Sequence, residues 1–388
     1  VGIIGGCCGT NPDYIRLLAD IIANRAPQQR PAPTSFTVTG AQRLVELPQD
    51  SRRVAVIGER INPTGKKRLQ AALREDNLDY VVGQGISQQE QGADVLDVNV
   101  GLPGIDEPRM IARAVEALQG ATLLPLQIDS TNADAIEAGV RAYAGKPIIN
   151  SVNGKQEALD AVLPIAAHYG CNVIGLTLDE DGIPATASER VAIARRIIDE
   201  AARYGIGRER ILIDCLVMTA STNQAQVTEI LRAVTLCRQE LGVHCTLGVS
   251  NVSFGLPARE LLNATFLAAA FGAGLDAPIM NPGSQRYMDA VHSYRVLNAE
   301  DLGSVRFIER YAGWNDPYKV PVNVASTPTA PSSTAPATSP NTAPSPASAT
   351  SAQGNGELHH LVLSGRKANV PALVRDLLAA HDAMDVID

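Results

Sequence analysis

Carboxylate and carboxamide side chains recur along the middle of this sequence, and each follows a short apolar run. The set comprises Glu59 and Asn62, with Arg60 between them, and then Asn99, Asp129, Asn150, Asp179, Asp214, Asn251 and Asn281. A carboxylate accepts two parallel N–H bonds, whereas a carboxamide both donates and accepts. Few of these positions are cationic, so phosphate is a poor ligand for them. The set suits a flat heterocycle with several N–H donors and ring-nitrogen acceptors.

The elements that would position these side chains are apolar runs that alternate with amphipathic helices over residues 54–312. Helical periodicity is clear in Glu189–Tyr204 and Gln226–Leu241. Near-continuous apolar strands separated by helices indicate a parallel sheet covered on both faces. Eight such units fit an α/β fold of the (β/α)8 TIM-barrel type, which has about 250 residues. A doubly wound open sheet is the competing architecture. The predicted strands are Val54–Gly58, Val95–Val100, Leu123–Ile128, Pro147–Val152, Val173–Leu178, Ile211–Asp214, Thr246–Ser250 and Ala277–Met280.

In a barrel, the carboxyl ends of all strands meet at one mouth, where active sites lie. The preference of Asn and Asp for turns and helix caps explains any single polar position of the set, but not eight in register. The predicted mouth is therefore rich in acids and amides. The 2-amino group, N3–H and O4 of a pterin ring form an edge that matches such a mouth.

Six segments resemble the motifs of pterin-binding methyltransferase barrels, and they occur in that family's order. The first two read GERINPTG at residues 58–65 and GADVLDVNVG at residues 92–101. The other four read LQIDS at 126–130, INS at 149–151, ID at 213–214 and GVSNVSFGLP at 248–257. This resemblance covers residues 54–312. It implies a barrel that binds methyltetrahydrofolate and presents its methyl group to a corrinoid.

The resemblance also implies roles for individual residues. Asn251 becomes the group that contacts N5, the nitrogen that carries the methyl. A tertiary amine nitrogen is a poor leaving group, so N5 needs a proton or a strong hydrogen bond as the methyl departs, and a carboxamide can donate one. The implied pterin-holding residues are Asp129, Asn150 and Asp214, and the implied neighbours at the mouth are Asn99, Ser250 and Arg259.

The segments before the barrel are predicted to belong to another domain. Residues 1–24 read as one β-α unit, and GGCCGT at residues 5–10 resembles the end of the homocysteine-binding barrel of cobalamin-dependent methionine synthases. That resemblance implies that Cys7 and Cys8 bind zinc together with a third ligand absent from this chain. One such unit cannot bury its own apolar face, so the rest of this truncated barrel is expected upstream of Val1. Residues 25–53 are predicted to be a connector.

After the barrel, residues 313–356 are predicted to be a linker rich in Pro, Ala, Ser and Thr, because such a segment buries too little apolar surface to offset its ordering entropy. Residues 357–388 regain helical periodicity and resemble the start of the helical cap of a cobalamin-binding domain. The sequence has no Asp-x-His-x-x-Gly motif to ligate a corrinoid. Cobalamin is therefore expected on a domain beyond Asp388.

Composition narrows the class of protein. The formal net charge of −8 gives no electrostatic support to a nucleic-acid partner. No apolar run reaches the roughly 18 residues that a membrane span needs. Four of the six cysteines lie in apolar surroundings, which suits reduced, buried thiols and a cytoplasmic protein.

The favoured interpretation is an internal part of a cobalamin-dependent methionine synthase. It would bind 5-methyltetrahydrofolate and transfer the N5 methyl group to cob(I)alamin, as a half-reaction of methionine synthesis from homocysteine. A methyltetrahydrofolate:corrinoid/iron–sulfur protein methyltransferase shares the barrel but needs no flanking segments. A dihydropteroate synthase should carry Asn-x-Thr-Pro-x-Ser-Phe in its first loop, where residues 62–66 read NPTGK. A non-catalytic folate-binding scaffold would keep the same pocket.

Overall fold

The computed structural model describes residues 3–26, 33–49, 51 and 53–314. The chain divides into two compact units, of which the first ends at Asn315. The predicted helical segment over 357–388 lies outside the described residues, as does all but the start of the predicted linker over 313–356. The fold is therefore built from the first unit.

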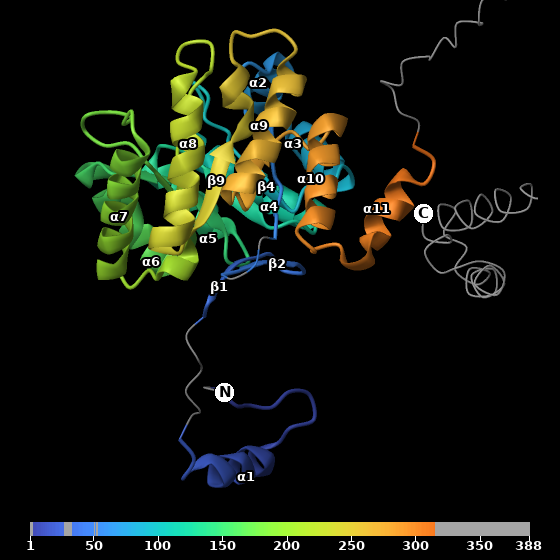
Figure 1. Cartoon of the computed structure of the whole chain (residues 1–388). Coiled ribbons are helices and arrows are strands. Elements are labelled where there is room, and N and C mark those ends of the chain that lie inside the picture. Colours follow the sequence, from blue (N-terminus) through green and yellow to red (C-terminus); the bar gives the residue numbers. More distant parts are fainter. Residues whose placement is uncertain (1–2, 27–32, 50, 52, 315–388) are drawn as a thin grey trace, which may run out of the picture. The chain divides into compact units, whose positions relative to one another are not determined.

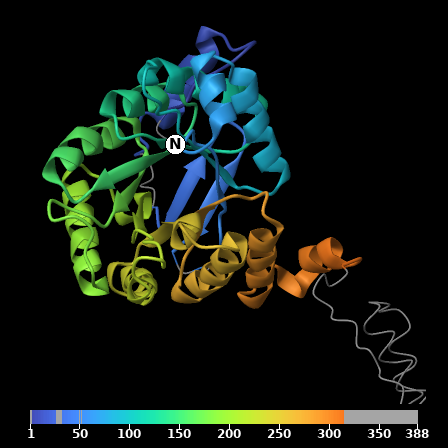
Figure 2. The same ribbon diagram turned by 90° about the horizontal axis from the view of Figure 1, so that it is seen from above.

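Eight parallel strands close into a barrel, in the order β10-β3-β4-β5-β6-β7-β8-β9, which confirms the predicted (β/α)8 architecture (Figures 1 and 2). Each strand pairs with the next one along the chain, and β10 closes the ring against β3. The view from above shows the helices arranged around the strands (Figure 2). The barrel strands are β3 (Ile57–Ile61), β4 (Val95–Val98), β5 (Leu126–Asp129), β6 (Ile148–Asn153), β7 (Asn172–Leu176), β8 (Ile211–Asp214), β9 (His244–Gly248) and β10 (Ala277–Met280).

Four of the helices around the barrel begin at a residue whose side chain caps the first turn. Thr186 and Glu189 form a reciprocal capping box at the start of α7. The side chains of Asn77, Asp106 and Asn132 accept backbone N–H groups at the starts of α3, α4 and α5. The helices of the barrel and its C-terminal extension are α2 (Lys67–Arg74), α3 (Leu78–Glu90), α4 (Glu107–Ala121), α5 (Ala133–Ala142), α6 (Gln156–Tyr169), α7 (Ala187–Arg203), α8 (Ala225–Leu236), α9 (Arg259–Ala273), α10 (Gln285–Leu297) and α11 (Val305–Tyr311).

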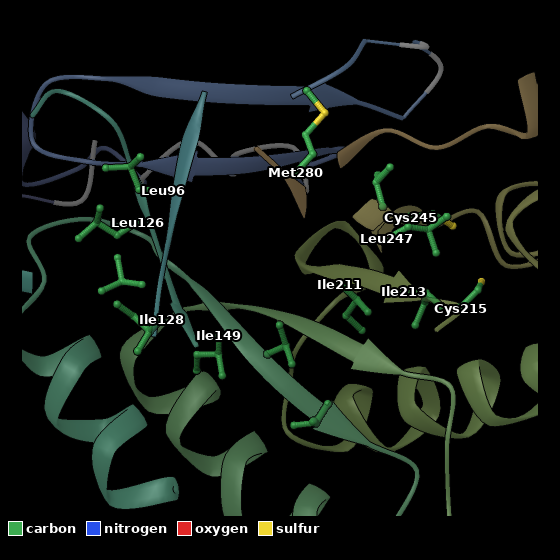
Figure 3. Packing of buried hydrophobic residues seen from close by; sticks show 14 of the residues in the cluster. Leu96, Leu126, Ile128, Ile149, Ile211, Ile213, Cys215, Cys245, Leu247 and Met280 are labelled. Atoms are coloured by element: carbon green, nitrogen blue, oxygen red, sulfur yellow. The ribbon is translucent and has the colours of Figure 1, made fainter. Parts of the chain in front are cut away.

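Side chains alternate along each strand between two surroundings, the apolar layer beneath the helices and the interior of the barrel. In β5, Leu126 and Ile128 belong to the main apolar cluster between strands and helices (Figure 3), whereas Gln127 and Asp129 occupy the intervening positions. Successive side chains of a strand point to opposite faces. The polar residues of the strands therefore face the barrel interior, near its carboxyl end.

A two-stranded antiparallel sheet covers the other end of the barrel. It consists of β1 (Ser35–Thr39) and β2 (Leu44–Pro48). Phe36 and Leu47 form a second apolar cluster with residues from the starts of the barrel strands, such as Ile148. The Tyr143 hydroxyl donates a 2.9 Å hydrogen bond to the carbonyl of Thr39, which ties the sheet to the barrel. The connector predicted over 25–53 thus includes an element that seals the barrel floor.

The N-terminal segment contains one helix, α1 (Pro12–Ile22), which is the helix of the β-α unit predicted over residues 1–24. The Asn11 side chain accepts hydrogen bonds from the backbone N–H groups of Asp13 and Tyr14. No residue of α1 is buried. Residues 3–6 do not form the expected strand, because a strand needs a hydrogen-bonded neighbour and none is provided within 3–26.

The described residues include no helix that is both long enough and apolar enough to span a membrane.

Candidate active site

The mouth of the barrel holds a cavity of about 720 Å³, which falls in the usual range for small-molecule sites. It opens at the carboxyl end of the strands. Acids and amides from different strands line it, as the sequence predicts, together with residues from α9 and α10. The lining includes Glu59, Asn62, Asp97, Asp129, Asn150, Asp214, Ser250, Asn251, Arg259, Asn263, Asn281 and Tyr287.

Asp129 and Asn150 are direct neighbours across the β5–β6 pairing. Asn99 does not line the cavity, but its side-chain amide donates a 3.0 Å hydrogen bond to Asp129 Oδ2. This contact holds the carboxylate from outside the cavity. Burial raises the pKa of Asp129 to about 6, while the bond from Asn99 opposes that rise. Asp129 and Asn150 therefore present one acid and one amide side by side to the cavity.

Asp97, on β4, is a buried acid that also lines the cavity and was not among the predicted residues. Its Oδ1 accepts a 2.6 Å hydrogen bond from the amide of Gln127. Burial raises the pKa of Asp97 well above its ordinary value, and the nearby charge of Asp129 raises it further. Asp97 therefore ionises less readily than an exposed acid, and it lies close to a second carboxyl group, Asp129, whose pKa burial also raises.

Asp214 ends β8, which only β7 separates from β6 in the strand ring, and it lines the same cavity. Its Oδ1 accepts a 2.7 Å hydrogen bond from the backbone N–H of Leu216. Burial raises the pKa of Asp214 to about 7, against the lowering effect of that bond and of the Arg190 charge. Arg190 is fully buried and donates to the carbonyls of Cys215 and Leu216. It thereby fixes the turn that carries Asp214.

Asn251 projects from η3 (Val249–Ser253), a short 3-10 helix that follows β9. Gly248 precedes this helix, and a Cβ atom there would come within 2.9 Å of the Asn251 amide nitrogen. Glycine at this position therefore leaves room for the carboxamide. Arg259 donates to the Ser250 carbonyl and to Ser253 Oγ, both at 2.9 Å. These two contacts hold η3 against the start of α9.

Glu59 lines the same mouth from β3. The Ser250 hydroxyl donates a 3.2 Å hydrogen bond to Glu59 Oε2. Burial raises the pKa of Glu59, although this bond and the charges of Lys66, Arg60 and Arg259 oppose the rise. The Lys66 amine donates to the Glu59 backbone carbonyl at 3.0 Å, and burial lowers the pKa of Lys66. An acid and an amine therefore meet on this side of the mouth.

Two further lining residues, Asn263 and Tyr287, come from helices rather than strand ends. The Asn263 amide donates a 2.7 Å hydrogen bond to the Tyr287 hydroxyl. Asn263 is only 1% exposed, and its side-chain oxygen accepts no hydrogen bond from the described residues. That oxygen is a buried acceptor available to a ligand. Neither residue follows a strand, so the strand-end pattern could not find them.

The structure brings six of the seven predicted mouth residues to one cavity. They are Asp129, Asn150, Asp214, Ser250, Asn251 and Arg259. The seventh, Asn99, acts on the cavity through Asp129. Asp179, part of the wider strand-end set, does not line the cavity and pairs instead with Gly182 in its own loop.

Cys7 and Cys8, the predicted zinc ligands, are exposed free thiols. Among the described residues, no group of three His, Cys, Asp or Glu side chains could hold a metal ion. A catalytic zinc site needs three protein ligands. The residues of this chain that the structure describes therefore do not make a zinc site by themselves.

We expect the ligand-free protein to lose stability as the pH rises from about 4 to 7. The raised pKa of Asp214, about 7, means that the folded chain keeps a proton that the unfolded chain has already released in this range. Ionisation therefore favours unfolding, by on the order of 4 kcal/mol over the full range for this group. Urea midpoints across this range measure the effect.

The Asp214→Asn variant is the control for this prediction, because it keeps the shape of the side chain without the titration. Its stability should depend less on pH, and the remaining dependence is due to the other buried acids of the mouth, Asp129, Asp97 and Glu59. An equally steep dependence in this variant would show that Asp214 does not titrate in this range.

Comparison with known proteins agrees with this site. The family model described as "Pterin binding enzyme" matches residues 58–281. Dihydropteroate synthase from Xanthomonas albilineans superposes with a TM-score of 0.52 at 23% identity, over 68% of this chain and 99% of that chain. The Yersinia pestis dihydropteroate synthase gives a TM-score of 0.54 at 17% identity, over 69% and 100%. These two likenesses establish the fold alone.

Curated relatives at higher identity are, by name, a methionine synthase and a methyltransferase. The chain is 33% identical over 324 residues to the methionine synthase of Mycobacterium tuberculosis, which is 80% of this chain and 27% of that protein. It thus spans about a quarter of that protein's length. It is also 31% identical over 264 residues to the methylcorrinoid:tetrahydrofolate methyltransferase of Eubacterium limosum, which is 66% of this chain and 94% of that protein. With its closed barrel and acid- and amide-lined mouth, the chain belongs to the family of pterin binding enzymes.

Proposed function

We propose that this chain binds 5-methyltetrahydrofolate at the barrel mouth and transfers its N5 methyl group to cob(I)alamin. The transfer would be a half-reaction of methionine synthesis from homocysteine. The observation that carries the proposal is the convergence of Asp129, Asn150, Asp214 and Asn251 on one cavity. Membership of the pterin binding family supports a pterin as the ligand of these groups.

The pterin would be held along its polar edge. The carboxylates of Asp129 and Asp214 are suited to accept N–H bonds from the 2-amino group and N3, since an ionised carboxylate is an acceptor only. Asn150 can donate to a carbonyl oxygen and accept from an N–H. Because burial raises the pKa of both acids, binding of these N–H donors favours the ionised forms and releases protons.

The chemical step breaks the N5–CH3 bond and forms a cobalt–carbon bond. Cob(I)alamin, the methyl-accepting substrate, supplies the electron pair of the new bond. The pair of the broken bond stays on N5, which takes up a proton. The Asn251 amide would donate a hydrogen bond to N5 that strengthens as the methyl leaves. Glu59 and Asp97 line the same cavity, and burial raises the pKa of each, which favours the protonated form of both carboxyl groups.

The extent of the match supports a methionine synthase in particular. The alignment with the Mycobacterium tuberculosis protein spans 324 residues, which is longer than the barrel and so includes flanking segments. The methylcorrinoid:tetrahydrofolate methyltransferase of Eubacterium limosum matches over 94% of its own length, which favours the second candidate: methyl transfer between a corrinoid and tetrahydrofolate without the flanking domains. Both candidates use the same mouth.

The partners of the reaction follow from this proposal. Cobalamin would be carried by a further domain of the same polypeptide, and homocysteine would be bound by a domain upstream. Zinc would need a third ligand from that upstream domain in addition to Cys7 and Cys8, so no step here involves zinc. The four buried free thiols suit a reducing compartment such as the cytoplasm.

Anaerobic methyl transfer to free cob(I)alamin tests the proposal. The protein is mixed with 5-methyltetrahydrofolate and cob(I)alamin, and the absorbance of cob(I)alamin is followed as it is methylated. We expect a rate that saturates with the folate and needs the protein. If the protein binds the folate and the corrinoid stays unmethylated under strong reduction, the chain is a folate-binding scaffold and the proposal is wrong.

A further inference from the structure

Three of the four buried cysteines are in contact with one another. They are Cys215, directly after Asp214 at the end of β8, Cys245 on β9, and Cys237 at the end of α8. The Cys237 sulfur forms hydrogen bonds with the thiols of the other two residues, which also bond to each other. We name these three residues the thiol cluster. Cys171, the fourth buried cysteine, has no contact with it.

The thiol cluster lies between the barrel strands and α8. The strand register pairs Ile213 of β8 with Cys245 of β9, and Cys215 follows two residues later, so the two thiols point to the same face. Cys245 Sγ donates a 3.8 Å hydrogen bond to the carbonyl of Val234 in α8. All three cysteines are 0% exposed, and Figure 3 shows two of them within this apolar layer. In the part of the chain that the structure describes, no group of three His, Cys, Asp or Glu side chains could hold a metal ion. Oxidation to a disulfide is the reaction to which adjacent thiols are suited.

Strand geometry selects the pair that a disulfide can join. Cys215 and Cys245 are separated by two residues along the strand direction and by one strand across, so their Cα atoms lie roughly 8 Å apart. A disulfide needs about 4.4–6.8 Å between Cα atoms, so Cys237 must be one of the partners. Cys245 is fixed within β9, where its backbone N–H bonds to Asp276. Cys215 lies beyond the strand end, in a turn that can move. The bond is therefore expected between Cys237 and Cys215.

Cys237 is the thiol that is best placed to react first. The hydrogen bonds from Cys215 and Cys245 lower the pKa of Cys237, against the opposing effect of burial. The thiolate is the nucleophilic form of a cysteine. Cys237 is also the first residue of η2 (Cys237–Leu241), a short π-helix that interrupts the α-helical hydrogen bonding after α8. We expect the layer that covers the cluster to open locally at this interruption.

The turn that carries Asp214 would be displaced by the new bond. Arg190 donates to the carbonyls of Cys215 and Leu216, and the backbone N–H of Leu216 bonds to Asp214 Oδ1. Leu216 has a φ of 58°, a left-handed conformation that is unfavourable for a residue other than glycine. A covalent bond holds two sulfurs closer together than a contact between thiols does. Cys215 must therefore shift towards Cys237, and the adjacent Asp214 shifts with it.

We propose that the thiol cluster is an oxidation site, at which hydrogen peroxide joins Cys237 to Cys215 and thereby weakens folate binding at Asp214. Peroxide first oxidises the Cys237 sulfur to a sulfenic acid, and one water is released. The Cys215 sulfur then attacks this sulfur, so that the S–S bond forms and the hydroxyl group leaves as a second water. The two thiols supply the two electrons and two protons that peroxide takes up, and a thiol reductant reverses the change. The effect on folate binding rests on the proposed function, whereas the disulfide can be detected without it.

Disulfide mapping after peroxide treatment tests the inference on the intact chain. Excess peroxide is removed, free thiols are blocked, and the linked peptides are identified by mass spectrometry. We expect a bond between Cys215 and Cys237 that forms more slowly than oxidation of the exposed Cys7 and Cys8. The affinity for 5-methyltetrahydrofolate, measured by calorimetry, should fall about tenfold, as expected when one hydrogen bond to a charged group is weakened. A thiol reductant should restore it.

The variant Cys237→Ala should keep its folate affinity after peroxide treatment, because the bond to Cys215 cannot form. Cys171→Ala is the matched control, since it removes a thiol that is also 0% exposed but lies outside the thiol cluster. It should lose affinity as the unaltered chain does. The variant Cys7→Ser/Cys8→Ser should lose affinity in the same way, because the two exposed thiols do not cause the effect.

Three results would overturn the inference. One is the absence of a bond between Cys215 and Cys237 under conditions that oxidise Cys7 and Cys8. Another is a bond between Cys237 and Cys245 that leaves the folate affinity unchanged. The third is an equal loss of affinity in the Cys237→Ala variant. If the untreated chain binds no folate, the proposed function fails, and the disulfide map still decides whether the thiol cluster is an oxidation site.

Discussion

Replacement of Asn251 by alanine is expected to slow methyl transfer to cob(I)alamin by roughly 10²–10³-fold, with a much smaller change in folate affinity. The amide is proposed to donate a hydrogen bond that matters most when N5 becomes the leaving atom. An interaction that strengthens in the transition state contributes to the rate rather than to ground-state binding. Single-turnover transfer gives the rate, and calorimetric titration gives the affinity.

The Asn251→Asp variant separates the effect of hydrogen-bond donation from the effect of side-chain shape. An ionised carboxylate has nearly the same size as the carboxamide and donates no hydrogen bond. This variant should therefore be about as slow as Asn251→Ala. Unchanged turnover in either variant would remove Asn251 from the mechanism.

Asp214→Ala is expected to weaken binding of 5-methyltetrahydrofolate by roughly 10²-fold or more, because two charge-assisted hydrogen bonds to the pterin are lost. The affinity of the unaltered protein should also fall as the pH drops below 7. The pKa of Asp214 is about 7 in the empty site, so below that pH the carboxyl is protonated and has lost acceptor capacity. Titration calorimetry at a series of pH values measures both effects.

Asp214→Asn is the matched variant for this prediction. It retains one acceptor oxygen and should bind with intermediate affinity, and its affinity should depend less on pH. The backbone N–H of Leu216 keeps a hydrogen-bond acceptor in this variant, so the turn should persist. An alanine variant that binds the folate as tightly as the unaltered protein would exclude Asp214 from the site.

The face of the sheet to which each strand residue points was predictable, because side chains alternate between the two faces and this alternation depends only on neighbouring residues. In β8, the alternation of Ile211, Leu212, Ile213 and Asp214 already places the acid on the face opposite to Ile211 and Ile213. The same alternation explains Asp129 at the end of β5. No knowledge of distant contacts is needed to place these two side chains inside a barrel.

Strand ends were less predictable, since they depend on distant partners. Val54–Gly58 reads as a strand, but β3 begins at Ile57 and extends to Ile61. The backbone N–H groups of Val54 and Val56 bond to the side chains of Glu300 and Asp94 instead of a strand. Glu300 is 246 residues away in the sequence, so periodicity cannot reveal this contact.

The sequence predicts that the polar residue after each strand faces the cavity. This prediction fails at Asn99 for a physical reason. Asn99 lies past the end of β4, where its side chain caps the turn at Gly101 and supports Asp129 rather than facing the cavity. Asp97, two residues earlier, is the β4 residue that reaches the mouth. The one signal available in the sequence was an acid inside an apolar strand, which is costly unless the acid is paired.

The sheet of β1 and β2 has a consequence for the order of events in the proposed reaction. The sheet packs apolar side chains across the barrel floor. The mouth cavity is therefore closed at that end and is approached only from the carboxyl end of the strands. The folate that donates the methyl group and the corrinoid that accepts it must then enter through the same opening, and a docked corrinoid would cover the bound folate. Under the proposed function, folate would therefore bind before the corrinoid and leave after it, and each turnover would require the corrinoid carrier to withdraw before the folate is exchanged.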